Sequence, residues 1–225
     1  MTDFLYKISP FLQIAYQFIQ NIIPLIVAIV LHELSHGVVA YMLGDDTAKR
    51  ANRLNLYNHF DFYGSFVIPV GLYLMHCPFM IGYAKPVPVD PRNFKRPIND
   101  MAMVAIAGPA CNLLLAIVGS MFVSKDLYTI TFTQKILINF IAINLGLFFF
   151  NLIPIPPLDG SRILAAFLPL RLLPTFYKYE GLGFFIIIGV EVASKYVAGL
   201  FGSNLSLFDF CVVKPLMITL RALIS

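Results

Sequence analysis

Long runs of apolar residues with almost no charge dominate the sequence, and a soluble domain cannot accommodate them. Hydrophobic residues make up 59% of the 225-residue chain and charged residues only 12%, about half of the roughly 25% typical of soluble domains. So few charges cannot cover the surface of a water-soluble globule. A helix crosses the hydrocarbon core of a bilayer with about 20 mostly apolar residues. We therefore predict a multi-pass integral membrane protein whose surroundings are the lipid bilayer.

The net charge and the cysteines argue against two other classes of protein. The formal net charge of +4 is small and the basic residues are scattered, so we expect no nucleic-acid partner. The cysteines are odd in number, far apart and without a Cys-x-x-Cys pair: Cys77, Cys111 and Cys211. This arrangement predicts neither a disulfide framework nor a thiolate zinc site. We interpret the cysteines as small apolar residues in packed helices.

Several runs are long enough to cross a bilayer; they are residues 8–44, 62–84, 101–124, 136–158 and 182–201. In the first run, Pro24 suits the first turn of a helix that ends near Leu43, which leaves 8–20 as a separate interfacial or spanning piece. The apolar tail 205–225 could span, lie in the interface or pack on the helix bundle. We predict an all-α polytopic membrane protein with about five to six transmembrane helices. Its single domain, 1–225, would have a core in 20–165 and C-terminal helices in 182–225.

The run 62–84 is a poor helix candidate. Glycine and proline interrupt it at Gly64, Pro69, Gly71, Pro78 and Gly82. The segment 65–70, Ser-Phe-Val-Ile-Pro-Val, is typical of extended chain. We predict a re-entrant or β-hairpin element, which is tolerated at membrane depth only where protein or water shields its backbone.

The basic connectors support this interpretation of 62–84. If this run returns to its own side, the connectors 45–61, 85–100 and 159–181 share one face and bring together 10 of the 16 Lys and Arg residues. Cytoplasmic loops carry an excess of Lys and Arg. The basic face is therefore predicted to be cytoplasmic, whereas a simple crossing at 62–84 would split the basic loops between two sides.

Residues 31–37, Leu-His-Glu-Leu-Ser-His-Gly, place ionisable side chains inside the first apolar run. His32 and His36 are four positions apart, so on a helix both imidazoles reach one point on one face. Two neutral imidazole nitrogens suit Zn²⁺. Glu33 lies about a quarter-turn away and can take a proton from a metal-bound water without being a ligand. This pattern is typical of zinc metalloproteases.

The depth of this cluster favours a functional role. His32 lies eight residues after Pro24, or roughly 12 Å along a helix, which places the cluster well inside the bilayer. An ionised Glu at the membrane centre costs about 2.5–3.5 kcal/mol on insertion scales, and ionisable groups at that depth are functional by default. The structural alternative is a polar patch that hydrogen-bonds a neighbouring helix.

A catalytic zinc site needs a third protein ligand and an open position for water. Asp159 is the preferred candidate, because the prolines before it break the helix and Gly160 lets the chain turn closely. Asp159 could also be the N-cap of a helix that begins at Ser161. Less favourable candidates are His59 in a basic connector, His76 in the interrupted run, and Glu191, which a helical ion pair with Lys195 explains.

The order and spacing of these motifs resemble the site-2 protease family of intramembrane zinc metalloproteases. The resemblance covers most of residues 25–165, from His32-Glu33-x-x-His36 in one apolar helix to Asn151…Leu158-Asp159-Gly160 at the end of another. Further segments are similar to the compact prokaryotic branch without a PDZ domain: His59-Phe-Asp61 with Gly64, Gly82-Tyr-Ala-Lys-Pro-Val-Pro-Val89, and Ala107-Gly-Pro-Ala-Cys-Asn112.

The resemblance implies the chemistry of the site. One Zn²⁺ per chain would be held by His32, His36 and Asp159. Glu33 would act as general base and then as general acid. Asn151 would help to hold the substrate carbonyl or its oxyanion.

The resemblance also implies contacts with a substrate, which would be a transmembrane segment of another protein. Asn112 would line the core near the site, with a buried helix–helix hydrogen bond as its alternative role. Residues 65–72 would pair with the substrate backbone. Because a helical peptide bond is shielded, substrates are expected to carry helix-breaking residues near the cut. The protein would lie in a prokaryotic cell membrane, and no oligomeric state follows from the sequence.

The predicted function is therefore an intramembrane zinc endopeptidase, and a membrane metal-ion transporter or sensor is the alternative. A transporter needs ligands or carboxylates staged along a path. Here the ionisable groups at membrane depth are nearly confined to one site, formed by His32, Glu33, His36 and Asp159. A catalytically silent scaffold is a third possibility, against which the intact ligands and base argue.

Overall fold

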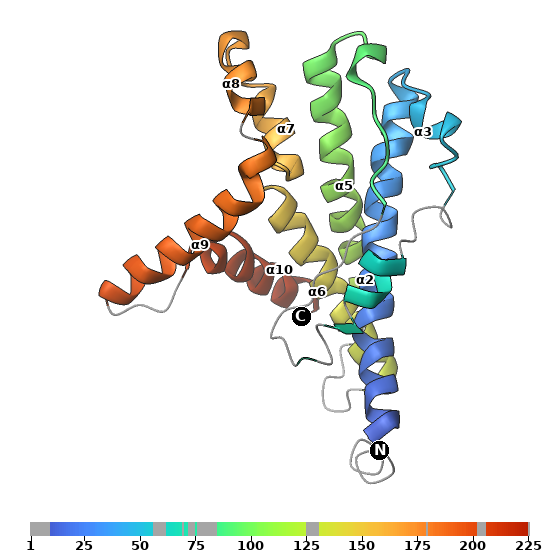
Figure 1. The fold of residues 1–225 in the computed structure, drawn as a ribbon. Coiled ribbons are helices and arrows are strands. Elements are labelled where there is room, and N and C mark those ends of the chain that lie inside the picture. The colour runs from blue at the N-terminus through green and yellow to red at the C-terminus, as the bar shows by residue number, and fades with distance from the viewer. Residues whose placement is uncertain are drawn as a thin grey trace.

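The computed structural model describes residues 10–55, 62–68, 70–71, 75, 85–124, 131–178, 180–201 and 206–224 (Figure 1). Every regular element within these residues is helical, which confirms the all-α class. The α-helices are α2 (Pro10–Met42), α3 (Thr47–Arg50), α5 (Pro97–Ser120), α6 (Phe132–Asn151), α7 (Asp159–Ala165), α8 (Leu173–Lys178), α9 (Gly183–Leu200) and α10 (Lys214–Ile224). Short π-helical segments span Phe62–Val67 and Asp209–Val213, and 3-10 turns span Pro91–Asn93, Leu170–Leu172 and Glu180–Leu182.

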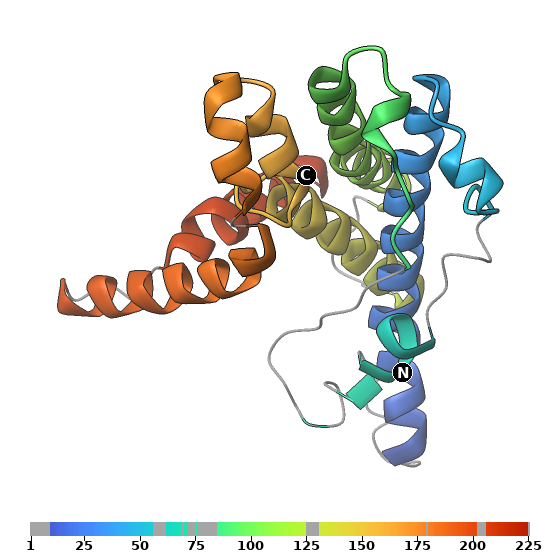
Figure 2. The same ribbon diagram turned by 45° about the horizontal axis from the view of Figure 1, so that its top comes forward.

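Three helices of the described chain are long and apolar enough to cross a membrane: Ile19–Met42 within α2, Pro97–Ser120 and Phe132–Asn151. The chain is an integral membrane protein. The described residues contain three such helices, so the predicted count of five to six is not confirmed. α5 packs against both α2 and α6, and α2 also contacts α6. In Figures 1 and 2, α9 leads away from these helices, so α2, α5 and α6 form the central bundle.

The sequence predicts that the first spanning helix begins near Pro24, but the structure places its start earlier. α2 runs without interruption from Pro10 to Met42, so the described part of 8–20, residues 10–20, is not a separate piece. A proline inside a helix removes the hydrogen bond to the carbonyl four residues earlier, here that of Gln20. The side-chain amide of Asn139 on α6 donates to this carbonyl at 3.4 Å. A neighbouring helix therefore satisfies the group that Pro24 leaves free, and α2 continues.

The predicted extended segment 65–70 is helical in the residues described. Phe62–Val67 is a π-helix, and residues 68, 70 and 71 are also helical. An extended chain needs a partner strand for its backbone groups, and no strand is present in the described part of the chain. A helical turn satisfies these groups locally, which outweighs the low helix propensity of Gly64. Apart from Met75, the rest of the predicted hairpin, including His76, lies outside the described residues, as do His59 and Asp61.

The second and third spanning helices begin and end earlier than the runs 101–124 and 136–158. Pro97 starts α5, since proline suits a first helical turn. A capping box starts α6, in which the Thr131 hydroxyl accepts from the backbone of Gln134 and the Gln134 side chain accepts from the backbone of Thr131. α6 ends at Asn151, before the proline-rich segment that removes backbone donors.

The C-terminal tail packs on the bundle. Leu220 of α10 is buried in a cluster with Ile141 and Leu145 of α6 and Ala116 of α5. Of the three alternatives that the sequence leaves for 205–225, packing on the other helices is therefore the one observed for α10. The predicted run 182–201 forms α9, in which Lys195 and Glu191 make the expected ion pair at 3.1 Å.

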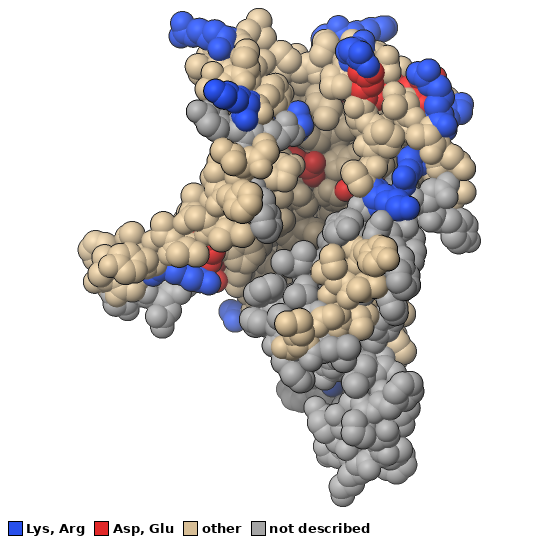
Figure 3. Space-filling model, viewed as in Figure 1, with Lys and Arg blue, Asp and Glu red and all other residues tan. Residues whose placement is uncertain are grey.

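The basic connectors gather at one end of the molecule. α3, the segment that precedes α5, and α7 with α8 all lie at the end shown uppermost in Figure 1. Lys and Arg side chains are concentrated along this rim in the same view of the surface (Figure 3). The charges predicted that these connectors share one face, and the described parts of the connectors do lie at one end of the molecule.

Candidate metal centre

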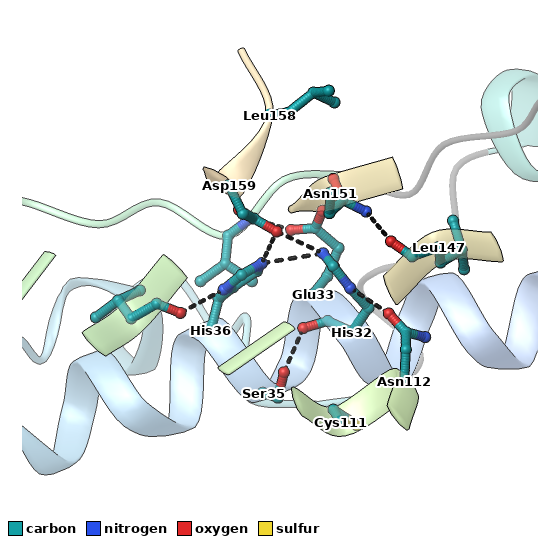
Figure 4. A network of polar contacts seen from close by, with 12 residues as sticks. His32, Glu33, Ser35, His36, Cys111, Asn112, Leu147, Asn151, Leu158 and Asp159 are labelled. Carbon is teal, nitrogen blue, oxygen red and sulfur yellow. Dashed lines mark hydrogen bonds and ion pairs between the residues drawn. The ribbon is translucent and has the colours of Figure 1, made fainter. Parts of the chain in front are cut away.

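Three side chains from two distant parts of the chain converge inside the bundle (Figure 4). The Nε2 atoms of His32 and His36 lie 3.2 and 3.4 Å from Oδ2 of Asp159. The two Nε2 atoms are 3.1 Å apart, and the three ligand atoms all lie within 4.8 Å of one another. Both imidazoles are buried, and the Asp159 side chain is 19% exposed. The structure thus brings together the two segments that the sequence predicts to meet.

The hydrogen bonds behind the imidazoles determine what these atoms can bind. Nδ1 of His36 lies 2.7 Å from the backbone oxygen of Val104, and Nδ1 of His32 lies 2.5 Å from Oδ1 of Asn112. Both oxygens are acceptors, so both Nδ1 atoms carry the proton. In the neutral rings the two Nε2 atoms are then acceptors as well.

The result is a buried cluster of acceptors without a donor. Oδ2 of Asp159 is buried and has no hydrogen-bond partner in the described part of the chain. Two imidazole lone pairs and a carboxylate oxygen that face one another repel unless a cation lies between them. Two neutral imidazoles and one carboxylate are a ligand set that suits Zn²⁺. The residues present therefore fit a zinc ion.

Two glycines permit the close packing around this centre. A Cβ atom at Gly108 of α5 would lie 2.5 Å from Cε1 of both His32 and His36. A Cβ atom at Gly160 would overlap the backbone oxygens of Leu152 and Ile153. Glycine at 108 lets α5 lie directly against the imidazoles. Glycine at 160 lets α7 start against the end of α6, which carries Asp159 to the site.

The carboxylate of Glu33 lies on the same side of α2 as the cluster (Figure 4). The backbone N–H of Val87 donates to its Oε2 at 3.3 Å. Val87 stands between Pro86 and Pro88, which have no backbone N–H. Within residues 86–88, the backbone donor is therefore the N–H of Val87. The contact keeps Glu33 at the site through a backbone group.

The two asparagines predicted to contact substrate lie in different places. The Nδ2 of half-buried Asn151 donates to the Leu147 carbonyl at 3.0 Å, which uses one of its two N–H groups. Asn112 is fully buried behind His32. Its amide makes the interhelical hydrogen bonds that the sequence leaves as its alternative role. It lies at Nδ1 of His32, on the other side of the ring from Asp159.

Asp159 does not cap a helix at Ser161. α7 begins at Asp159 itself, with Leu158 as the N-cap residue. The Ser161 hydroxyl donates to the Leu158 carbonyl at 2.7 Å. Because Gly160 allows an immediate turn, the helix starts two residues earlier than predicted, and the Asp159 carboxylate is free to point to the imidazoles.

Comparisons with known proteins identify the family of the chain. Residues 119–190 match Peptidase family M50. Over 188 residues, 78% of this chain and 82% of the other, the sequence is 38% identical to a Bacillus subtilis (strain 168) protein named "Putative zinc metalloprotease YwhC". The chain belongs to peptidase family M50. It is therefore a zinc metalloendopeptidase of the site-2 protease type in a membrane. No solved structure matches the chain.

The candidate site of this M50 peptidase is not sealed from the molecular surface. Figure 3 shows a hollow below the basic rim, with acidic side chains inside it. The imidazoles are buried, while Asp159 keeps part of its surface exposed. The candidate site is therefore in contact with solvent at Asp159.

Two contributors to the site carry little signal in the sequence. The Val104 carbonyl and the Val87 N–H are backbone groups, so no side-chain pattern reveals them. Asn144 is different, because it hydrogen-bonds Asn112 and lies seven residues before Asn151 on an apolar helix. Residues seven apart share a helix face, and a polar stripe inside a spanning helix is the signal that would have indicated it.

Proposed function

We propose that this M50 peptidase hydrolyses peptide bonds within or near the transmembrane segments of other membrane proteins. The observation that carries the proposal is the depth of the ligand cluster along α2. His32 is about 20 Å of helix from Ile19 and about 15 Å from Met42, the ends of the spanning segment. A hydrolytic site at that depth meets peptide bonds that lie inside the bilayer.

In this proposal His32, His36 and Asp159 are the zinc ligands. Their three acceptor atoms converge within 4.8 Å of one another, and the Glu33 carboxylate lies beside them. Zinc bound there supplies a Lewis acid that makes a water molecule acidic enough to lose a proton near neutral pH. The hydrogen bonds to Asn112 and Val104 hold both rings in the tautomer that zinc requires.

Glu33 is the general base and then the general acid. Its carboxylate accepts the proton of the attacking water and passes it to the nitrogen of the leaving amine, which balances the hydrolysis. Asn151 has one amide N–H that is not committed to Leu147. This N–H donates to the oxyanion, where one well-placed donor contributes about 3 kcal/mol.

The substrate must expose a peptide bond that an intact helix shields. We expect cleavage next to Gly, Pro or Asn residues, which lower the cost of local unwinding. The site opens near the basic rim, and Lys and Arg are enriched in cytoplasmic loops. We accordingly propose a multi-pass protein of a prokaryotic cell membrane with its site toward the cytoplasmic side.

Glu33→Gln tests this function against metal transport or sensing. In proteoliposomes, we expect the variant to keep zinc and to cleave a single-span substrate with a central Gly or Pro at least 100-fold more slowly, the scale of general acid–base catalysis. Glu191→Gln is the matched control, because Glu191 pairs with Lys195 at 3.1 Å on α9; it should retain both properties. Wild-type cleavage by Glu33→Gln, or zinc flux that the substitution leaves unchanged, would refute the proposal.

A further inference from the structure

A chain of side-chain amides connects α6 to the metal centre. The Nδ2 of Asn144, a fully buried residue, donates to the Phe140 carbonyl at 2.8 Å. Its Oδ1 accepts from Nδ2 of Asn112 at 2.8 Å. The Oδ1 of Asn112 in turn accepts from Nδ1 of His32 at 2.5 Å.

The direction of each bond in this chain follows from the one before it. A backbone carbonyl can only accept, so Phe140 fixes which end of the Asn144 amide faces Asn112. Asn144 then offers its oxygen, which fixes the Asn112 amide with its nitrogen toward α6 and its oxygen toward His32. Nδ2 of Asn112 also donates to the Ala28 carbonyl at 3.4 Å, and this longer contact favours the same orientation of the amide.

The direction of the Asn112 amide decides whether His32 can bind a metal. If this amide turned over, its Nδ2 would face Nδ1 of His32, and that nitrogen would have to accept. The ring proton would then lie on Nε2, the atom that faces Asp159 and His36. A protonated nitrogen has no lone pair for zinc.

His36 needs no such side-chain relay, because its Nδ1 faces the Val104 backbone oxygen directly at 2.7 Å. We infer that Asn144 is a positioning residue for the zinc site: acting through Asn112, it holds His32 in the tautomer that presents a free Nε2. The inference rests on the proposed zinc site. It adds to that site a residue, Asn144, that acts on His32 only through Asn112.

A purely structural role for Asn144 has a matched comparison on the same helix. Asn139 also joins α6 to a neighbour, since its Nδ2 lies 3.1 Å from Oδ1 of Asn21 and 3.4 Å from the Gln20 carbonyl. Both asparagines contribute interhelical hydrogen bonds. Asn144 differs in that its bond leads to a zinc ligand.

The test measures zinc affinity of the purified full-length protein in detergent, by competition with a chromogenic chelator. We expect Asn144→Leu to weaken zinc binding by about 10- to 100-fold, the range for loss of an outer-shell partner. Asn139→Leu should keep wild-type zinc affinity. If Asn144→Leu does not fold, Asn144→Ser provides the same test, because its hydroxyl can bond the Phe140 carbonyl but is too short to reach Asn112.

Asn112→Asp separates the relay from a general loss of packing. A carboxylate accepts at both oxygens, so it keeps the proton on Nδ1 of His32 whichever way it turns. In the Asn112→Asp background, Asn144→Leu should therefore leave zinc affinity unchanged or raise it. Equal losses in the two backgrounds, or unchanged affinity in Asn144→Leu alone, would overturn the inference.

His36→Ala is measured in parallel so that the two proposals fail separately. Its zinc binding should be lost. Wild-type zinc affinity in His36→Ala would refute the ligand set itself. Loss of zinc in His36→Ala together with wild-type affinity in Asn144→Leu would refute only the role of Asn144.

Discussion

Gly108 is the position where a single added carbon should disrupt the metal centre. In Gly108→Ala, the new Cβ would lie 2.5 Å from Cε1 of His32 and from Cε1 and Nε2 of His36. Ordinary contacts of a Cβ atom are 3.4–4 Å. The imidazoles, or α5 itself, must therefore move by about 1 Å, whereas metal–ligand distances tolerate only about 0.2 Å.

The expected loss of zinc affinity depends on the contacts that hold the imidazole rings in place. The rings are held at 2.5 Å by Asn112 and at 2.7 Å by the Val104 carbonyl, and a shift of about 1 Å exceeds the usual hydrogen-bond range. Overpacking a tight site costs about 1–3 kcal/mol. Expressed as binding, this corresponds to a loss of about 5- to 150-fold in zinc affinity.

The assay is chelator competition on the purified protein, with thermal unfolding of the metal-free form measured beside it. Gly146→Ala is the control, because it lies inside α6 and its Cβ would meet Leu216 Cδ1 at an ordinary 3.5 Å. This control should keep zinc affinity and gain about 0.5–1 kcal/mol of stability from the lower backbone entropy of alanine. Zinc affinity in Gly108→Ala within threefold of wild type would refute the close packing on which the reasoning depends.

Two further predictions concern charged groups. Asp159→Asn changes a proposed zinc ligand and should weaken zinc binding by more than the roughly 10- to 100-fold typical of outer-shell changes. Full zinc stoichiometry in the variant would exclude Asp159 as a ligand. Burial raises the pKa of Asp45, but hydrogen bonds from Thr47, Asn93 and the Asp90 N–H outweigh it and hold that pKa below its usual value. The carboxylate therefore stabilises the fold above its unfolded pKa of about 3.9, and this contribution is lost as pH falls through the lower folded pKa. Asp45→Asn should lower stability by about 1–3 kcal/mol at pH 7, a deficit that shrinks below pH ~4 in thermal unfolding; an equal deficit at pH 3 and pH 7 would contradict this.

Local patterns predicted much of this molecule. The apolar runs predicted an all-α membrane protein, and the spacing of His32 and His36 placed both rings on one face of a helix. The end of α6 before the prolines, together with Gly160, made Asp159 a candidate for the same site. In each case the geometry depends on residues a few positions apart, where helix periodicity or proline stereochemistry decides the result.

The errors occurred where distant parts of the chain meet. Pro24 predicted a helix start, but Asn139 of another helix satisfies the carbonyl that the proline leaves free, and α2 continues. The segment 65–70 was expected to be extended, but its described residues form helical turns. Propensity describes one segment at a time, whereas these outcomes depend on which donors and acceptors the neighbouring chain supplies.

The sequence by itself determined that the chain enters a membrane as helices and that two imidazoles and a carboxylate share one turn of one of them. Only the tertiary structure decided how close Asp159 comes to both imidazoles, which way the Asn112 amide turns behind His32, and how closely Gly108 lets α5 approach. The reason is physical: helical spacing follows from covalent geometry within a segment, but contacts between helices depend on side-chain volumes and hydrogen-bond directions that are fixed only when the segments pack.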